Sequence, residues 1–170
     1  YNSIDIQGGE PTIYPHIFEL IEYCNKIQLK PTLITNALVL NNYETCKKYK
    51  DAGVYDFLIS VQGIGDIYDE ITGTKNGSIK QIQALDNLNK LDIPFRFNTV
   101  LSKEVLPLLT DIAKIAVNKK ARVCNFIAFN PFSDQKDREF KNIAKYSEIA
   151  EVLIPVIDYL NENEIEVNIR

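Results

Sequence analysis

Residues 3–11 read SIDIQGGEP, a short β-type run that stops at two glycines, a glutamate and a proline. The run from Ser3 to Gln7 predicts a strand, because apolar and polar residues alternate along it and turn-forming residues follow. Two adjacent glycines let the backbone approach a ligand closely. Glu10 then presents a carboxylate that can accept hydrogen bonds from an ammonium group. This stretch therefore predicts a strand with a ligand-binding loop at its carboxyl end.

The rest of the chain alternates short β-branched runs with amphipathic stretches. Strands are predicted over residues 3–7, 32–35, 56–61, 95–100, 123–129 and from 166 onward, and helices over 16–29, 42–52, 78–91, 104–118 and 146–161. This alternation implies βαβ units with parallel pairing and right-handed crossovers. Six strands are too few for a closed eight-stranded barrel. The predicted fold is thus α/β, an open, partial TIM-like barrel in a single domain over residues 1–170.

Two details concern the chain between the third and fourth predicted strands. Residues 62–73 are predicted to form a solvated loop that ends at a turn, and Ser78 is predicted to cap the following helix. Gly63-Ile64-Gly65 opens like a dinucleotide-binding fingerprint, but the position of its third glycine is Tyr68. The fingerprint therefore fails, and no dinucleotide site is expected there.

Composition excludes several function classes. The chain has 170 residues, of which 45% are hydrophobic, so it can bury a sizeable core. Its net charge is −4 and it has no clustered cations, so nucleic-acid binding is not expected. No apolar run approaches the roughly 20 residues of a membrane span. No signal-peptide pattern is present either, and a cytoplasmic protein is expected.

Neither the cysteines nor the histidine is expected to take part in catalysis or in metal binding by this chain. Cys24, Cys46 and Cys124 are odd in number and widely spaced, which argues against disulfides and against a metal site in this chain. They are predicted to be buried small apolar residues. His16 is predicted to lie on the surface near a helix start. No catalytic residue is assigned.

Small and polar residues follow the predicted strands. Ligands bind at the carboxyl ends of parallel strands, so these residues would meet at one rim of the sheet. The glycine, carboxylate, hydroxyl and amide groups there would fit an amino-acid-like ligand that carries a sugar. Turn residues are common at the strand ends of any parallel fold, and this plainer interpretation stays open. The rim residues include Gly8, Gly9, Glu10, Pro11, Asn36, Ser60, Gln62, Asn98 and Asn130.

The order of these strand-end motifs resembles that of radical S-adenosylmethionine (SAM) enzymes, over roughly residues 3 to 132. The first motif, GGEP, is one of five that recur at successive strand ends. The motifs are Ile4–Thr12, Thr35-Asn36-Ala37, Ile59–Gly63, Asn98-Thr99-Val100 and Phe126–Pro131.

The resemblance implies that the rim binds SAM. Gly8 and Gly9 would lie against the methionine part, with the Gly9 backbone and Glu10 near the amino group. Ser60 would face the ribose or the carboxylate, and Asn98 the methionyl carboxylate or the ribose.

Four further positions of the rim follow from the same resemblance. Backbone around Phe129 and Asn130 would flank the adenine. Asn36 and Gln62 would either point to the substrate or cap their own loops.

One departure from the family is clear. The family holds a [4Fe–4S] cluster with three cysteines in the pattern CxxxCxxC, on a loop that precedes GGEP, and this sequence has no such pattern. The chain begins at Tyr1, contains no methionine and ends within a predicted strand. We therefore expect an interior fragment whose first strand and cluster loop lie upstream, and which is inactive alone. A natural relative that kept the SAM pocket without radical chemistry is the alternative.

For the full-length protein, the resemblance implies SAM and a [4Fe–4S] cluster as cofactors. It also implies an electron donor such as flavodoxin or ferredoxin. The substrate is open between a peptide, a cofactor precursor and a nucleotide. Two rival functions remain: a non-catalytic binding module on the same scaffold, and an ordinary aldolase-type barrel enzyme. The aldolase would need a Schiff-base lysine or a metal set at the strand ends, and the sequence offers neither.

Overall fold

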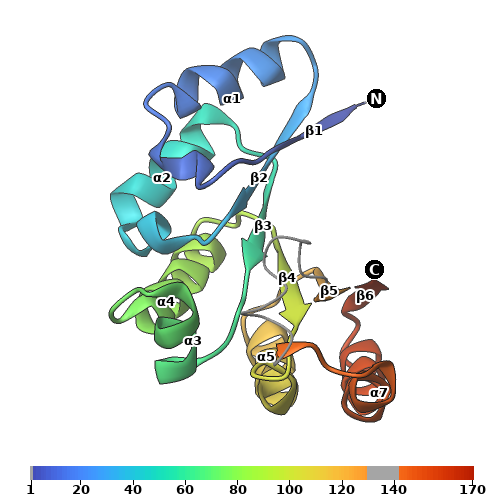
Figure 1. The fold of residues 1–170 in the computed structure, drawn as a ribbon. Coiled ribbons are helices and arrows are strands. Elements are labelled where there is room, and N and C mark those ends of the chain that lie inside the picture. Colours follow the sequence, from blue (N-terminus) through green and yellow to red (C-terminus); the bar gives the residue numbers. More distant parts are fainter. Residues whose placement is uncertain (1, 130–141) are drawn as a thin grey trace.

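Six parallel strands form one open sheet in the computed structural model, which describes residues 2–129 and 142–170 (Figure 1). The strands follow one another across the sheet in chain order, and every neighbouring pair is parallel. This order confirms the predicted partial barrel, since each βα crossover advances the sheet by one strand in the same direction. The strands are β1 (Ser3–Ile6), β2 (Lys30–Thr35), β3 (Asp56–Ser60), β4 (Phe95–Leu101), β5 (Val123–Ala128) and β6 (Glu166–Ile169).

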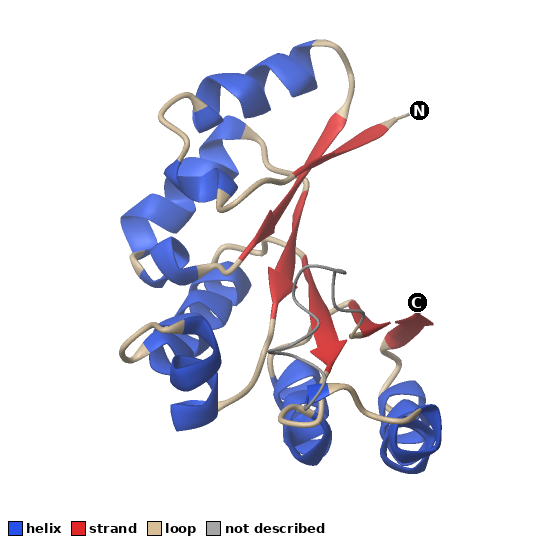
Figure 2. Cartoon of the chain, viewed as in Figure 1, coloured by secondary structure: helices blue, strands red, loops and turns tan. Residues whose placement is uncertain are grey.

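Helices cover the outer side of the curved sheet (Figure 2). The α-helices are α1 (Ile17–Lys26), α2 (Tyr43–Ala52), α3 (Gly65–Thr72), α4 (Gly77–Lys90), α5 (Leu109–Asn118) and α7 (Tyr146–Glu162). In the described part of the chain, short 3₁₀ helices follow three of the strand ends: η1 (Pro11–Ile13), η2 (Leu38–Asn41) and η3 (Leu106–Leu108). Within the described residues, no helix is long and apolar enough to cross a membrane.

The core lies between the sheet and these helices. Along β4, buried and half-buried residues alternate, so Phe95 and Phe97 point to the helices while Arg96 and Asn98 point to the concave inner face. Phe57 on β3 is the register partner of Phe95 and is fully buried. The two faces of the sheet therefore differ: apolar toward the helices, and largely polar on the inner face.

The segment predicted as a solvated loop contains helix α3, so that prediction is wrong. Tyr68 is 1% exposed and packs in the interior. Gly73 ends the helix in the left-handed conformation, at φ 64°. The predicted cap at Ser78 is also wrong, because α4 begins one residue earlier, after Asn76. Asp69 of α3 accepts hydrogen bonds from the backbone N–H groups of Asn76 and Ser78 and so takes over the capping role.

A second boundary differs for a similar reason. The predicted helix over residues 104–118 divides into η3, which contains Pro107, and α5, which starts at Leu109. Proline lacks the N–H group that a continuing helix would use, so it is confined to the 3₁₀ turn.

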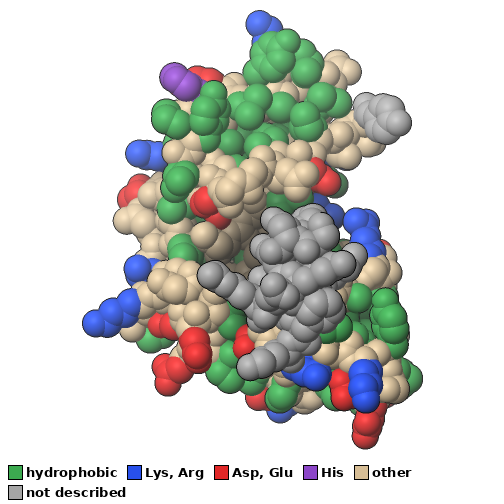
Figure 3. Space-filling view, in the orientation of Figure 1, with side chains coloured by type: hydrophobic (Ala, Val, Ile, Leu, Met, Phe, Trp, Pro, Cys, Tyr) green, Lys and Arg blue, Asp and Glu red, His purple; other side chains and the backbone are tan. Residues whose placement is uncertain are grey.

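On the face shown in Figure 3, hydrophobic side chains gather at the end of the molecule where α1 lies. Exposed apolar side chains of this region include Ile13, Tyr14 and Tyr23. His16 lies there as well and, as predicted, is exposed, within 3.6 Å of Glu19. On this face, the basic side chains are dispersed and do not form a stripe.

All three cysteines are buried, as predicted, and lie on α1, α2 and β5. Burial raises the pKa of the Cys46 thiol to about 11 and that of Cys124 to about 12. A thiol whose pKa is raised by folding stabilises the fold below its ordinary pKa near 9, and this contribution is lost as the pH rises toward the folded value. Stability should therefore fall in the alkaline range above about pH 9.

Alkylation of the native protein at neutral pH is expected to leave Cys46 and Cys124 unmodified. The thiolate fraction of Cys124 should be about 1000-fold below that of a free thiol, because the pKa rises from 9 to about 12. Iodoacetamide labelling followed by peptide mass spectrometry measures this directly. Urea-unfolded protein is the control, in which both peptides should be labelled. Rapid labelling of Cys124 in the native protein would contradict its burial.

Candidate functional site

The candidate site is the rim formed by the carboxyl ends of the strands. Because all six strands are parallel, their carboxyl ends lie at the same edge of the sheet. Gly8, Gly9 and Glu10 follow β1, Asn36 follows β2, and Ser60 is the last residue of β3. The predicted rim residues of the first three strands thus lie on adjacent strand ends.

The Glu10 carboxylate joins the loop after β1 to the loop after β2. Its Oε1 accepts hydrogen bonds from Thr12 N at 3.1 Å, Thr12 Oγ1 at 2.5 Å and Thr35 Oγ1 at 2.6 Å. Its Oε2 accepts one from Asn36 N at 2.9 Å. A carboxylate has about four acceptor positions, shared between two oxygens. Oε2 therefore retains room for a further donor, while Oε1 is fully used. Pro11, which directly follows, is buried and starts η1.

Nothing in the described chain requires glycine at positions 8 and 9. Both residues are exposed, and neither has a positive φ. Apart from its two chain neighbours, no described residue has an atom within 4 Å of a Cβ added at either position. These glycines therefore leave a free face of backbone at the rim, beside Glu10, which a ligand can approach closely.

Ser60 and Asn98 are register partners on β3 and β4, so the structure brings these two predicted residues together. Both are half-buried on the inner face. Neither side chain forms a hydrogen bond with another described residue, although Asn98 O accepts one from Val61 N at 2.9 Å. A half-buried hydroxyl and a half-buried amide without partners are suited to a polar ligand.

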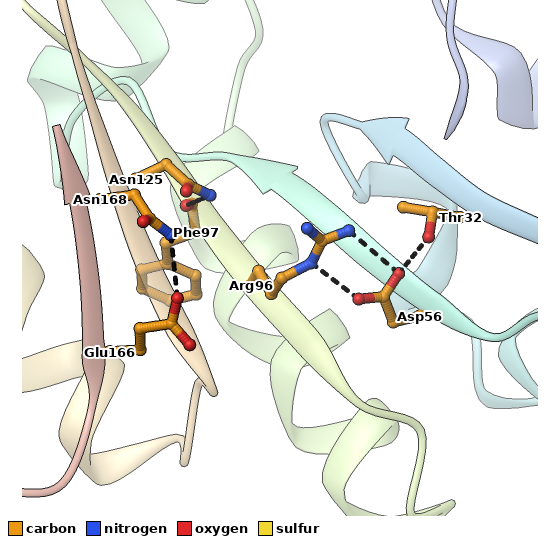
Figure 4. Close-up of polar contacts among 7 residues, drawn as sticks. All are labelled: Thr32, Asp56, Arg96, Phe97, Asn125, Glu166 and Asn168. Atoms are coloured by element: carbon orange, nitrogen blue, oxygen red, sulfur yellow. Dashed lines mark hydrogen bonds and ion pairs between the residues drawn. The ribbon is translucent and has the colours of Figure 1, made fainter. Parts of the chain in front are cut away.

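The row of polar side chains that starts with Ser60 and Asn98 continues across the sheet. Asn98 is the register partner of Asn125 on β5. Asn125 in turn is the partner of Asn168 on β6, and Figure 4 shows these two side chains. Asn125 Nδ2 donates to Phe97 O at 3.1 Å, which fixes the orientation of its amide. Ser60, Asn98, Asn125 and Asn168 thus form one level of hydroxyl and amide groups on the inner face.

An ion pair lies on the same face, nearer the start of the strands (Figure 4). Asp56 of β3 is 5% exposed, and its Oδ2 lies 2.7 Å from Nε of Arg96 on β4. Arg96 Nη2 donates to Asp56 Oδ1 at 3.2 Å, and the Thr32 hydroxyl donates to the same oxygen at 2.5 Å. The buried carboxylate is therefore neutralised within the sheet, below the level of Asn98.

Gln62 and Phe129 border a cavity of about 370 Å³ beyond the ends of β3, β4 and β5. Phe129 also borders a second cavity of about 540 Å³. The glycines and Glu10 do not line these cavities. Asn130, the other residue expected to flank an adenine, lies outside the described residues. The first cavity is lined by Gln62, Ile71, Val100, Ser102, Glu104, Val105, Phe129 and Asn142.

The Asn36 side chain caps its own loop, which was one of its two predicted roles. Its Oδ1 accepts a hydrogen bond from Leu38 N at 2.9 Å, at the start of η2. The backbone carbonyl of Asn36 accepts from Gln81 Nε2 at 2.9 Å. Gln81 is a residue that the rim motifs miss. The available signal was its position on the apolar face of α4, in a pattern shared with Ala84, Leu85 and Leu88.

The residues of this chain do not suit an iron–sulfur cluster. The three cysteines lie on separate elements, and the described residues contain no group of three His, Cys, Asp or Glu side chains that could hold a metal ion. The rim, by contrast, suits the groups of SAM. It offers exposed glycine backbone and an acceptor oxygen for an ammonium. The Ser60 hydroxyl and the Asn98 amide, which form no side-chain hydrogen bond with another described residue, suit a carboxylate or ribose.

Comparisons with known proteins point to one family. The family model of the radical SAM superfamily matches residues 1–106. A PqqA peptide cyclase from Rhodopseudomonas palustris is 32% identical over 116 residues, which are 68% of this chain and 30% of that protein. An AdoMet-dependent heme synthase from Methanosarcina barkeri is 30% identical over 112 residues, 65% of this chain and 32% of that protein.

Among solved structures, SuiB of Streptococcus suis bound to S-adenosylmethionine is similar in fold, with a TM-score of 0.78 and 22% identity over 99% of this chain and 39% of SuiB. SuiB bound to its precursor peptide SuiA gives a TM-score of 0.80 at 20% identity, over 99% of this chain and 38% of SuiB. The chain spans about a third of the length of the curated relatives named above.

Proposed function

Since this chain belongs to the radical SAM superfamily, we propose that its rim binds S-adenosylmethionine in a radical SAM enzyme. The observation that carries the proposal is the free backbone of Gly8 and Gly9 beside the Glu10 carboxylate. No contact among the residues that the structure describes needs glycine at either position, so close approach of a ligand explains them. The chain's own residues bind and orient SAM, and the cluster ligands come from outside this chain.

Each rim group has a proposed part in holding SAM. The Gly9 carbonyl and Glu10 Oε2 accept hydrogen bonds from the methionyl ammonium, where a charge-assisted bond is stronger than a neutral one. Ser60 and Asn98 donate to the methionyl carboxylate or bind the ribose hydroxyls. Pro11 fixes the turn from the glycines into η1.

Four residues belong to the other end of the ligand or to its surroundings. The backbone at Phe129 and Asn130 flanks the adenine. Gln62 and the cavity of about 370 Å³ face the substrate side. The loop-capping bond of Asn36 holds the second strand end in place.

When bound beside a reduced [4Fe–4S] cluster, SAM supplies a 5′-deoxyadenosyl radical. This reaction needs a one-electron donor such as a flavodoxin or ferredoxin, and we place the protein in the cytoplasm with it. A peptide is the first substrate class to test, because a PqqA peptide cyclase and SuiB, which was solved with a precursor peptide, are both similar to this chain. A cofactor precursor comes second, on the likeness to a heme synthase.

The test uses the full-length protein with its cluster reconstituted under anaerobic conditions. Isothermal titration calorimetry should show SAM binding, and addition of dithionite should release 5′-deoxyadenosine and methionine. Binding without cleavage would favour the non-catalytic module. Failure to bind SAM at all would overturn the proposed function.

A further inference from the structure

Gln81 is a polar residue in the apolar core. It lies on α4 and is 4% exposed, on the face that also carries the buried Ala84, Leu85 and Leu88. A buried amide is costly unless it is hydrogen-bonded, so its partners show why it is tolerated there.

The partners of Gln81 are two carbonyls at the rim. Its Nε2 donates to Asn36 O at 2.9 Å and to Ser60 O at 3.0 Å. The Tyr68 hydroxyl lies farther away, at 3.4 Å. An amide NH₂ carries two protons, so the two shorter bonds use both of them. Gln81 thus bridges the ends of β2 and β3 from beneath.

This bridge begins where the strand pairing stops. The register of β2 and β3 ends with Thr35 opposite Ile59. Asn36 and Ser60 each come one residue later, so no described strand pairing fixes their separation. The amide of Gln81 extends the connection by one residue, into the loops that carry the proposed site.

The same connection reaches the first strand. Asn36 N donates to Glu10 Oε2 at 2.9 Å, while Asn36 O accepts from Gln81. Glu10, Asn36, Gln81 and Ser60 therefore form one continuous hydrogen-bonded chain across the ends of β1, β2 and β3.

We propose that Gln81 is a positioning residue for SAM binding, which sets the spacing between the Glu10–Asn36 side of the site and Ser60. It acts through the two carbonyls and does not touch SAM. A site held in its binding geometry before the ligand arrives avoids the cost of ordering it on binding. This inference rests on the proposed function of the rim.

The first test replaces Gln81 by methionine in the full-length, cluster-reconstituted protein. Q81M keeps the length of the side chain and removes both donors. SAM affinity measured by calorimetry is expected to fall about 3- to 10-fold, which is the change in affinity that loss of one ordinary hydrogen bond produces.

Asn87 provides a matched control on the same helix. It is also 4% exposed, and its Nδ2 donates at 2.9 Å to two carbonyls, those of Leu40 and Asn41. Those carbonyls belong to η2 and not to the strand ends. N87L should lower the melting temperature about as much as Q81M but leave the SAM affinity unchanged. Equal weakening of SAM binding by Q81M and N87L would overturn the inference, as would wild-type affinity in Q81M.

A second variant tests the hydrogen bond itself. In Q81E, an ionised carboxylate faces two carbonyls without a donor, whereas the protonated form donates one bond. The ratio of Q81E to wild-type SAM affinity should therefore rise as the pH falls. The Tyr68 hydroxyl lies 3.4 Å from the Gln81 amide, and Glu10 is connected to that amide through Asn36. These groups, and Asp69 next to Tyr68 in the chain, are the same in both proteins, so the ratio reports the change at residue 81. Burial and the neighbouring Asp69 and Glu10 charges raise the pKa of Tyr68 to about 12, beyond this range.

A ratio that does not change with pH would contradict positioning through a donated hydrogen bond. Titration of the wild-type protein with SAM distinguishes failure of the proposed role of Gln81 from failure of the proposed function. If the wild-type protein binds SAM and Q81M binds it equally well, only the role of Gln81 fails. If the wild-type protein does not bind SAM, the proposed function fails, and this inference with it.

Discussion

Replacement of Glu10 by alanine is expected to weaken SAM binding to the full-length protein by about 10- to 150-fold. A charge-assisted hydrogen bond to an ammonium contributes roughly 1.5–3 kcal/mol, which corresponds to that range of affinity. The Glu10 Oε2 atom accepts one hydrogen bond within the chain, from Asn36 N, and so has room for the ligand. Calorimetric titration of both proteins measures the difference.

Glu10 also holds two loops together, and a control variant must separate this tie from direct binding. T35V removes the hydroxyl that donates to Glu10 Oε1 at 2.6 Å, yet leaves the charge in place. We expect T35V to weaken SAM binding less than E10A does, because T35V removes one hydrogen bond of the tie and the one that Thr35 Oγ1 accepts from Ala37 N, while the carboxylate that would contact the ammonium stays. Unchanged affinity in E10A would exclude the proposed contact with the ammonium. Equal losses in E10A and T35V would show that Glu10 acts only as a tie.

Replacement of Arg96 by leucine is expected to lower the free energy of unfolding by about 3 kcal/mol. Asp56 is 5% exposed, and Arg96 is its charged partner, at 2.7 Å. Without the guanidinium, the buried carboxylate keeps only the Thr32 hydroxyl as a side-chain donor among the described residues. An uncompensated buried charge is costly, so the loss should exceed that of a surface pair. Urea unfolding of the full-length protein, followed by circular dichroism, measures it.

Two further variants show whether this loss of stability comes from the buried charge. K47A breaks the exposed pair of Lys47 and Asp51, whose side chains are 51% and 61% exposed, and should change stability by less than about 0.5 kcal/mol. The double variant D56N/R96L removes the buried charge as well, and should recover much of the stability. If R96L costs no more than K47A, the Asp56–Arg96 pair does not stabilise the fold.

The order of strands and helices could be predicted from the sequence because its signals are local. Alternation with a period of two marks strands such as Phe95–Leu101, and turn residues mark their ends. Helix α3 could not be predicted from local signals, because Tyr68 is buried against α4, where Gly77 and Gln81 lie beside it. A Cβ on Gly77 would lie 2.6 Å from Tyr68 Cε1, so glycine is needed there to admit the ring. No local pattern shows that requirement.

The sequence by itself determined the parallel open sheet and the polar residues that meet at its rim, because both follow from periodicity and from the ends of successive strands. Only the tertiary structure decided what each polar group is bonded to. Glu10 is bonded to Thr35 and Asn36, 25 and 26 residues away, and Gln81 to Asn36, 45 residues away. Such partners are brought together by packing of the helices against the sheet. The carboxylate expected to stand free for a ligand is thus also the tie that holds its own rim in shape.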